Sequence, residues 1–227
     1  MHGSMIDALR KDILKSGIPL EIEVSQVFQK HSWKTANQFP YFDEKEKKIR
    51  AVDVVATKNI ALVFECKKST DHPWAFYTAP KSHPWPELIV KGGVIRTSKG
   101  AEVPPTTFPH SHILDAKIKA GMISYTPFGK KDDFFEAKNQ VLNGLFYVSP
   151  KKEDGAPGFP TYPVIVFDGE MYEFYLDNGK LRIAPIVYLQ FIASSPISRG
   201  DYLIDVLRKS YLLKFLEIVN HESEKQK

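Results

Sequence analysis

The chain has 227 residues, enough for one domain with a sizeable hydrophobic core, and 43% of them are hydrophobic and 26% charged. Its net charge of +4 permits a nucleic-acid partner without requiring one. The single cysteine, Cys66, excludes an internal disulfide framework and a cysteine-rich zinc site, and no apolar run approaches the roughly 20 residues that cross a bilayer. We therefore expect a protein of the reducing cytoplasm with no membrane partner.

Two helices are predicted at the start of the chain. Residues 6–15 have the pattern of a short helix that ends near Gly17. In residues 19–29 apolar side chains recur at helical spacing, and Pro19 suits a first helical position. The opening Met-His-Gly-Ser-Met lacks an apolar signal core and resembles a cloning remnant, with Met5 a plausible native start.

Three strands are expected next, over residues 33–41, 49–56 and 60–66. A short polar turn joins the second strand to the third, so these two form a hairpin. The third is apolar on both faces and should be a central strand that is covered on both sides.

Residues 69–131 are rich in proline and show little periodicity, which favours a long insertion that packs beside the core, with short helices at 87–91 and 112–120. Trp74 and Trp85 within it are candidates for base stacking, although packing onto the core is the simpler interpretation. A candidate phosphate-contacting surface is formed by its basic residues: Lys81, Lys91, Arg96, Lys99, Lys117, Lys119, Lys130 and Lys131.

After this insertion, a helix that begins at Asp132 and Asp133, with an acidic first turn, is predicted through Leu145. A loop at 151–160 leads to strands at 163–167, 173–176 and 183–191, and an amphipathic helix over 201–219 closes the chain. The predicted order is therefore helix, three strands, a long excursion, helix and strand. We expect one α/β domain over residues 1–227 with a mixed central sheet.

The predicted hairpin brings three charged residues together. Side chains alternate between the faces of a strand, so Glu65 and Lys67 share one face, and Asp53 lies 12 positions before Glu65 on the neighbouring strand. Asp53 and Glu65 offer the oxygen ligands that Mg²⁺ prefers, as phosphodiester hydrolysis requires. Lys67 beside them would orient or deprotonate the attacking water and offset developing charge. A surface ion pair without function is the alternative.

These residues resemble the motif of the PD-(D/E)XK, or restriction-endonuclease-like, superfamily. The segments that carry the resemblance are Gly17 to Glu21, Trp33, Arg50 to Ala56 and Glu65 to Lys68, and they are most similar to the Mrr-type and Holliday-junction-resolvase branch. Val52 stands where the signature has proline and Ser32 where glycine is usual. The resemblance implies an α-β-β-β-α-β core and a Mg²⁺- or Mn²⁺-dependent endodeoxyribonuclease acting in DNA repair, recombination or restriction.

The resemblance also implies two further site residues. A helical glutamate joins the metal site in this branch, to support a second metal ion or a coordinated water, and counting back from Trp33 indicates Glu21. Glu23 is the competitor, because it lies about 200° away on the same helix. Gln140, on the helix after the insertion, matches a glutamine that some of these families use.

Substrate and assembly stay open at this level. DNA is the expected partner, and a homodimer is expected because enzymes of this type that cut both strands often pair two sites. An RNA-directed nuclease would use the same residues. A module that keeps the fold but only binds DNA or assembles a complex is the alternative outside catalysis, and the intact Asp53, Glu65 and Lys67 argue against it.

Overall fold

A computed structural model describes residues 2–44, 46–69, 71–78, 89–91, 94–96, 102–103, 119–125, 133–148, 161–194 and 201–225. The first part of the chain contains α1 (His2–Lys15), α2 (Ile18–Gln29), β1 (Lys34–Asp43), β2 (Lys48–Thr57) and β3 (Ala61–Lys68). The middle part contains β4 (Trp74–Thr78), β5 (Ile89–Lys91), β6 (Val94–Arg96), β7 (Glu102–Val103), β8 (Lys119–Tyr125) and α3 (Asp133–Val148). The last part contains β9 (Thr161–Asp168), β10 (Met171–Asp177), β11 (Lys180–Ile186), β12 (Tyr188–Ser194), β13 (Asp201–Arg208), the 3₁₀ turn η2 (Lys209–Tyr211) and α4 (Leu212–Lys225).

Ten of the strands described here form one mixed sheet, in the order β1-β2-β3-β9-β13-β12-β8-β4-β10-β11. At one end β1, β2 and β3 form an antiparallel meander, and β9 joins β3 in parallel after the chain has passed through α3. A separate small sheet contains β5, β6 and β7. The protein is therefore an α/β protein with parallel and antiparallel pairs in one sheet.

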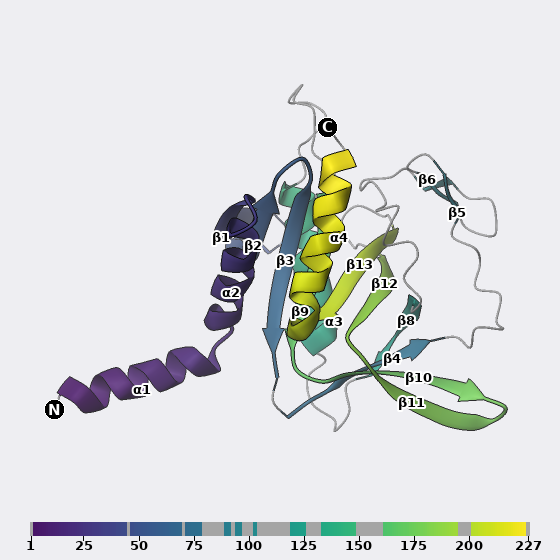
Figure 1. The fold of residues 1–227 in the computed structure, drawn as a ribbon, viewed down its shortest axis with the longest axis horizontal. Helices are drawn as coiled ribbons and strands as arrows, with labels where there is room; N and C mark the ends of the chain where they lie inside the picture. Colours follow the sequence, from purple (N-terminus) through teal and green to yellow (C-terminus); the bar gives the residue numbers. More distant parts are fainter. Residues whose placement is uncertain are drawn as a thin grey trace.

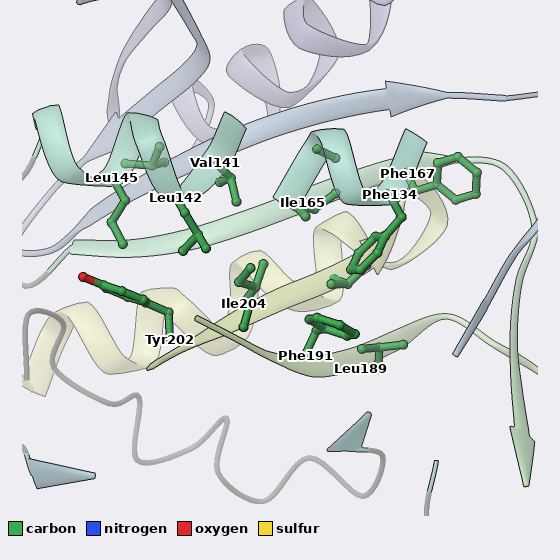
Figure 2. Packing of buried hydrophobic residues seen from close by; sticks show 14 of the residues in the cluster. Phe134, Val141, Leu142, Leu145, Ile165, Phe167, Leu189, Phe191, Tyr202 and Ile204 are labelled. Carbon is green, nitrogen blue, oxygen red and sulfur yellow. The ribbon is translucent and has the colours of Figure 1, made fainter. Parts of the chain in front are cut away.

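Helices cover both faces of the sheet, with α3 on one side and α2 and α4 on the other (Figure 1). The core under α3 is dominated by aliphatic and aromatic side chains, which Figure 2 shows interleaved between that helix and strands β9, β12 and β13. This α3-side cluster includes Val52, Val55, Val63, Trp74, Phe134, Val141, Leu142, Ile165, Phe167, Phe191 and Ile204. The cluster on the α2 and α4 side includes Leu20, Val24, Phe28, Trp33, Val54, Ala56, Phe64, Cys66, Val164, Val166, Leu207 and Phe215.

The predicted helix over 201–219 is wrong in its first half. Residues Asp201–Arg208 form β13, a strand between β9 and β12, and α4 begins only at Leu212. Ile204 and Val206 face the α3-side cluster, whereas Leu207 faces the α2 and α4 side. A strand that is apolar on both faces loses its period-two pattern, and its apolar residues then fit helical spacing as well.

Two other predictions need correction. The strand expected at 183–191 is two strands, β11 and β12, which separate at Val187. The stretch 69–131 does not merely pack beside the core, because β4 and β8 belong to the large sheet. Its expected helices at 87–91 and 112–120 are strands wherever they are described, and the rest of both ranges, like the loop at 151–160, lies outside the described residues.

Trp74 has a packing role. It is 1% exposed and stacks on Phe167 with ring centroids 3.8 Å apart, so it is a core residue rather than a base-stacking platform. Trp85 lies outside the described residues, as do the side chains of the basic residues named in the stretch 69–131. No helix within the described parts of the chain is long and apolar enough to span a bilayer.

Candidate active site

Asp53 and Glu65 lie where strands β2 and β3 separate. The last ladder pair toward this end of the hairpin is Val54 with Phe64, and one further step in the same register would place Asp53 opposite Glu65. There the Asp53 carboxylate accepts a hydrogen bond from the backbone N–H of Cys66, with Oδ2 at 2.8 Å. The Asp53 carboxylate of β2 thus accepts the Cys66 N–H of β3 in place of a backbone carbonyl.

Lys67 connects this strand end to helix α3. Its ammonium lies 2.9 Å from Glu65 Oε1 and donates to Gln140 Oε1 at 2.8 Å. Glu65 is 4% exposed, so its charge is removed from water and needs these donors. The structure therefore places Gln140, which the sequence pointed to only through the family resemblance, in direct contact with Lys67.

Glu21 approaches from the opposite side, on the first turn of α2. The residue is 8% exposed, and its Oε2 accepts a hydrogen bond of 2.5 Å from the Gln38 side chain. A Cβ atom added at Gly17 would lie 3.7 Å from Glu21 Oε1 and 3.9 Å from the Cys66 carbonyl oxygen. These two oxygens therefore border the same space. Glu23 points elsewhere and forms a 2.7 Å ion pair with Lys209.

Burial and neighbouring negative charges raise the pKa values of both acids at this strand end. Burial raises the pKa of Asp53 to about 6, the Cys66 N–H opposes that shift, and the Glu21 charge adds to it. Burial, followed by the Asp53 charge, raises the pKa of Glu65 to about 8. Burial lowers the pKa of Lys67, but the Glu65 carboxylate outweighs it and the net shift is upward. Glu65 and Asp53 thus share the positive charge of one ammonium.

This donor set fits a hard divalent cation. Mg²⁺ is usually held by one or two carboxylates with water completing the shell, and Asp53, Glu65 and the Cys66 carbonyl supply oxygens of that kind. In the described part of the chain no three His, Cys, Asp or Glu side chains form a ready-made cage, which a cation of this type does not require. The raised pKa values of Asp53 and Glu65 mean that their charged forms are destabilised in the metal-free site, and a bound cation would stabilise those charged forms.

Soft-metal chemistry finds no support here. Cys66 is 5% exposed and packs in the cluster on the α2 and α4 side, and burial holds the pKa of its thiol well above the usual value. The structure thus agrees with the interpretation of Cys66 as a core residue whose backbone, not its sulfur, contributes to the site.

Comparisons with protein-family models, with curated proteins and with solved structures found no match.

Two neighbours of the site were not identified from sequence. Gln38 lies on the edge strand β1, where nothing in its local sequence distinguishes it from a solvated polar residue. Glu136, one turn before Gln140 on α3, is the other, and its charge helps to raise the pKa of Lys67. Its spacing of four from Gln140 on a predicted helix was the only available signal.

Proposed function

We propose that this protein is a metal-dependent endodeoxyribonuclease of the PD-(D/E)XK type. The single observation that carries the proposal is the meeting of Asp53, Glu65 and Lys67 at the point where β2 and β3 separate. The order α2, β1, β2, β3, α3, β9, with β9 parallel to β3, supports it because it corresponds to the α-β-β-β-α-β core that the resemblance implies.

Asp53 and Glu65 are the residues that would hold Mg²⁺ or Mn²⁺. Glu65 is buried and Asp53 is partly buried, and the Asp53 charge adds to the raised pKa of Glu65. The bound ion would supply the Lewis acidity and positive charge that attack on an anionic phosphodiester requires. Glu21, whose carboxylate faces the same space from α2, would serve a second ion or orient water beside the first.

Lys67 would act as a cationic donor. Its raised pKa keeps it an ammonium at neutral pH, so in this arrangement it orients the nucleophilic water and stabilises charge on phosphate oxygens. Gln140 helps to hold the ammonium, because the Lys67 Nζ contacts both Gln140 Oε1 and Glu65 Oε1. The site thereby holds Lys67 in place before a substrate arrives.

DNA is the proposed substrate, and a homodimer the proposed assembly for cutting both strands. Support for DNA comes from the resemblance and from the mildly basic net charge of +4. An RNA substrate would use the same site, so the assay must include both nucleic acids.

The deciding experiment measures cleavage of linear, supercoiled, single-stranded and branched DNA and of structured RNA, with Mg²⁺, with Mn²⁺ and with a chelator. We expect DNA cleavage only with a divalent ion and none from Lys67→Ala. Binding without cleavage of any substrate would favour the binding-module alternative, and cleavage of RNA alone would replace the substrate but keep the site.

A further inference from the structure

Gln38 has an unusual backbone conformation for a strand residue. Its φ is +50°, in the left-handed region that residues other than Gly, Asn and Asp rarely adopt. The register of β1 with β2 is the same on both sides of this position, with Asn37 opposite Val54 and Phe39 opposite Val52. Gln38 therefore lies directly across from Asp53, and the irregularity inserts no extra residue.

Both strands change face at this point. On β2, Val52 and Val55 contact the α3-side cluster although they are three positions apart, which period-two alternation forbids. On β1, Thr35 bonds to Ser25 of α2, whereas Tyr41 stacks on Tyr147 of α3. The alternation of side chains between the two faces of the sheet is therefore interrupted at Gln38 on β1 and at Asp53 on β2. Beyond this point, odd-numbered side chains of each strand lie on the opposite face from those before it.

The switch brings the Gln38 side chain between two carboxylates. Its Nε2 donates to Glu21 Oε2 at 2.5 Å. Burial raises the pKa of Asp53, and a hydrogen bond from the Gln38 side chain is among the interactions that oppose this shift. Asn37 adds a second tie to α2 by donating to the Glu21 backbone carbonyl at 3.4 Å.

We propose that Gln38 is a positioning residue, whose side-chain amide holds the Glu21 carboxylate of α2 beside the Asp53 carboxylate of β2. The proposal deepens the proposed nuclease function, on which its catalytic consequence rests. An uncharged donor is suited to this role because its two N–H groups can face two carboxylates. A lysine or arginine in the same place would neutralise the acids and repel the cation that they are arranged to hold.

The backbone and the amide can be tested separately. Gln38→Ala removes the amide and leaves the left-handed strain, whereas Gln38→Gly removes the amide and relieves the strain. Gln38→Asn keeps a shorter amide in a conformation that asparagine tolerates. Gln29→Ala is the matched control, because Gln29 donates its amide to Thr35 on the same pair of elements, away from the carboxylates.

Two measurements decide the proposal. The first is the side-chain carboxyl ¹³C signal of Glu21 in the metal-free protein, with Glu23 on the same helix as internal control. The second is the Mg²⁺ dependence of DNA cleavage, separated into the half-saturating Mg²⁺ concentration and the rate at saturating Mg²⁺.

Gln38→Ala and Gln38→Gly should both move the Glu21 signal, leave that of Glu23 in place and raise the half-saturating Mg²⁺ concentration by roughly 10–100-fold. The rate at saturating Mg²⁺ should fall much less, Gln38→Asn should restore part of the affinity, and Gln29→Ala should match the wild type. Gln38→Gly should have a higher melting temperature than Gln38→Ala, because glycine relieves the backbone strain. The Gly variant therefore provides a folded protein without the amide.

An unchanged Glu21 signal in both variants overturns the positioning role, whatever the activity. Wild-type protein that cleaves nothing overturns the proposed function instead, and the Glu21 signal still decides whether Gln38 positions that carboxylate.

Discussion

The Asp53 carboxylate accepts the backbone N–H of Cys66 at 2.8 Å, so one side chain both ends the β2–β3 ladder and faces the proposed metal site. These two roles predict different results for two substitutions. Asp53→Asn keeps an oxygen that can accept the N–H and removes a partly buried charge, so the free energy of unfolding without metal should not fall. Asp53→Ala leaves a buried N–H without its partner, which should cost about 1–3 kcal/mol.

Both variants should lose metal binding and cleavage, because neither retains the negative charge. Chemical denaturation and calorimetric Mg²⁺ titration together measure the two effects. An Asp53→Asn protein that binds Mg²⁺ as tightly as the wild type would remove Asp53 from the metal site.

Lys67 and Lys68 form a matched pair for the second prediction. Lys67→Ala should abolish detectable cleavage, a loss of about 100-fold or more, since it removes a donor to the reacting groups. DNA affinity should hardly change, because affinity comes from many phosphate contacts. Lys68→Ala should retain cleavage, because the Lys68 ammonium donates to the Leu14 carbonyl oxygen of α1 instead. Equal losses for both variants would contradict a specific role for Lys67.

The site was largely predictable from sequence because its central residues lie on adjacent strands joined by a short turn. Period-two alternation placed Glu65 and Lys67 on one face, and the turn brought Asp53 alongside, which matches the observed contacts. A helix and three strands lie where they were predicted from α2 to β3, and a helix and a strand lie where they were predicted at α3 and β9, with strands β4 to β8 between the two groups. Strong apolar runs and clear turn signals specify those elements locally.

What sequence could not predict depends on tertiary context. Residues Asp201–Arg208 were predicted to be helical although they form β13. This strand is apolar on both faces, so its sequence lacks the alternation of apolar and polar residues that indicates a strand. Gln38 was missed for a different reason. Its left-handed conformation occurs at a residue that is neither Gly nor Asn, and its side chain interacts with Glu21 and Asp53, which lie on other elements.

The third prediction concerns pH. The pKa of Asp53 is raised to about 6 and that of Glu65 to about 8, so the folded metal-free protein binds protons more tightly than the unfolded chain. Their contribution to stability is therefore fully present below about pH 4, the unfolded pKa, and is lost as the pH rises toward 8. The free energy of unfolding without metal should fall across this range by a few kcal/mol at most.

Glu65→Gln should flatten this decline, because the group with the larger shift no longer titrates. Saturating Mg²⁺ should also flatten it for the wild type, since a cation stabilises the deprotonated acids. Denaturation curves between pH 4 and pH 9 give the slopes. A metal-free slope of the opposite sign would mean that these carboxylates are better satisfied than their burial indicates.

The fourth prediction separates the two glutamates of α2. Glu21→Gln should weaken metal-dependent cleavage, because Glu21 faces the Gln38 amide and the space beside the Cys66 carbonyl. Glu23→Gln should leave cleavage unchanged and cost at most about 1 kcal/mol, because Glu23 and Lys209 are an exposed pair at 44% and 36% side-chain exposure. Cleavage and thermal unfolding of both proteins test this, and the reverse pattern would reassign the ligand.

The fifth prediction tests how α3 presents Gln140 to Lys67. A Cβ added at Gly144 would lie 2.5 Å from Val52 Cγ2 and 3.3 Å from Val63 Cγ1, so the helix cannot accept it without moving. Gly144→Ala should therefore destabilise the protein by about 1–3 kcal/mol, as overpacking does. Because Gln140 is one turn away, the rate of cleavage at full saturation should fall as well. In an unpacked helix the same change would stabilise by up to about 1 kcal/mol, since alanine is the better helix former.

Val52→Ala removes the methyl group that the added Cβ would meet, so the double variant should be more stable than the sum of the single effects predicts. Denaturation of the four proteins in this cycle measures the coupling, and a stabilising Gly144→Ala would show that α3 does not rest on β2 as described.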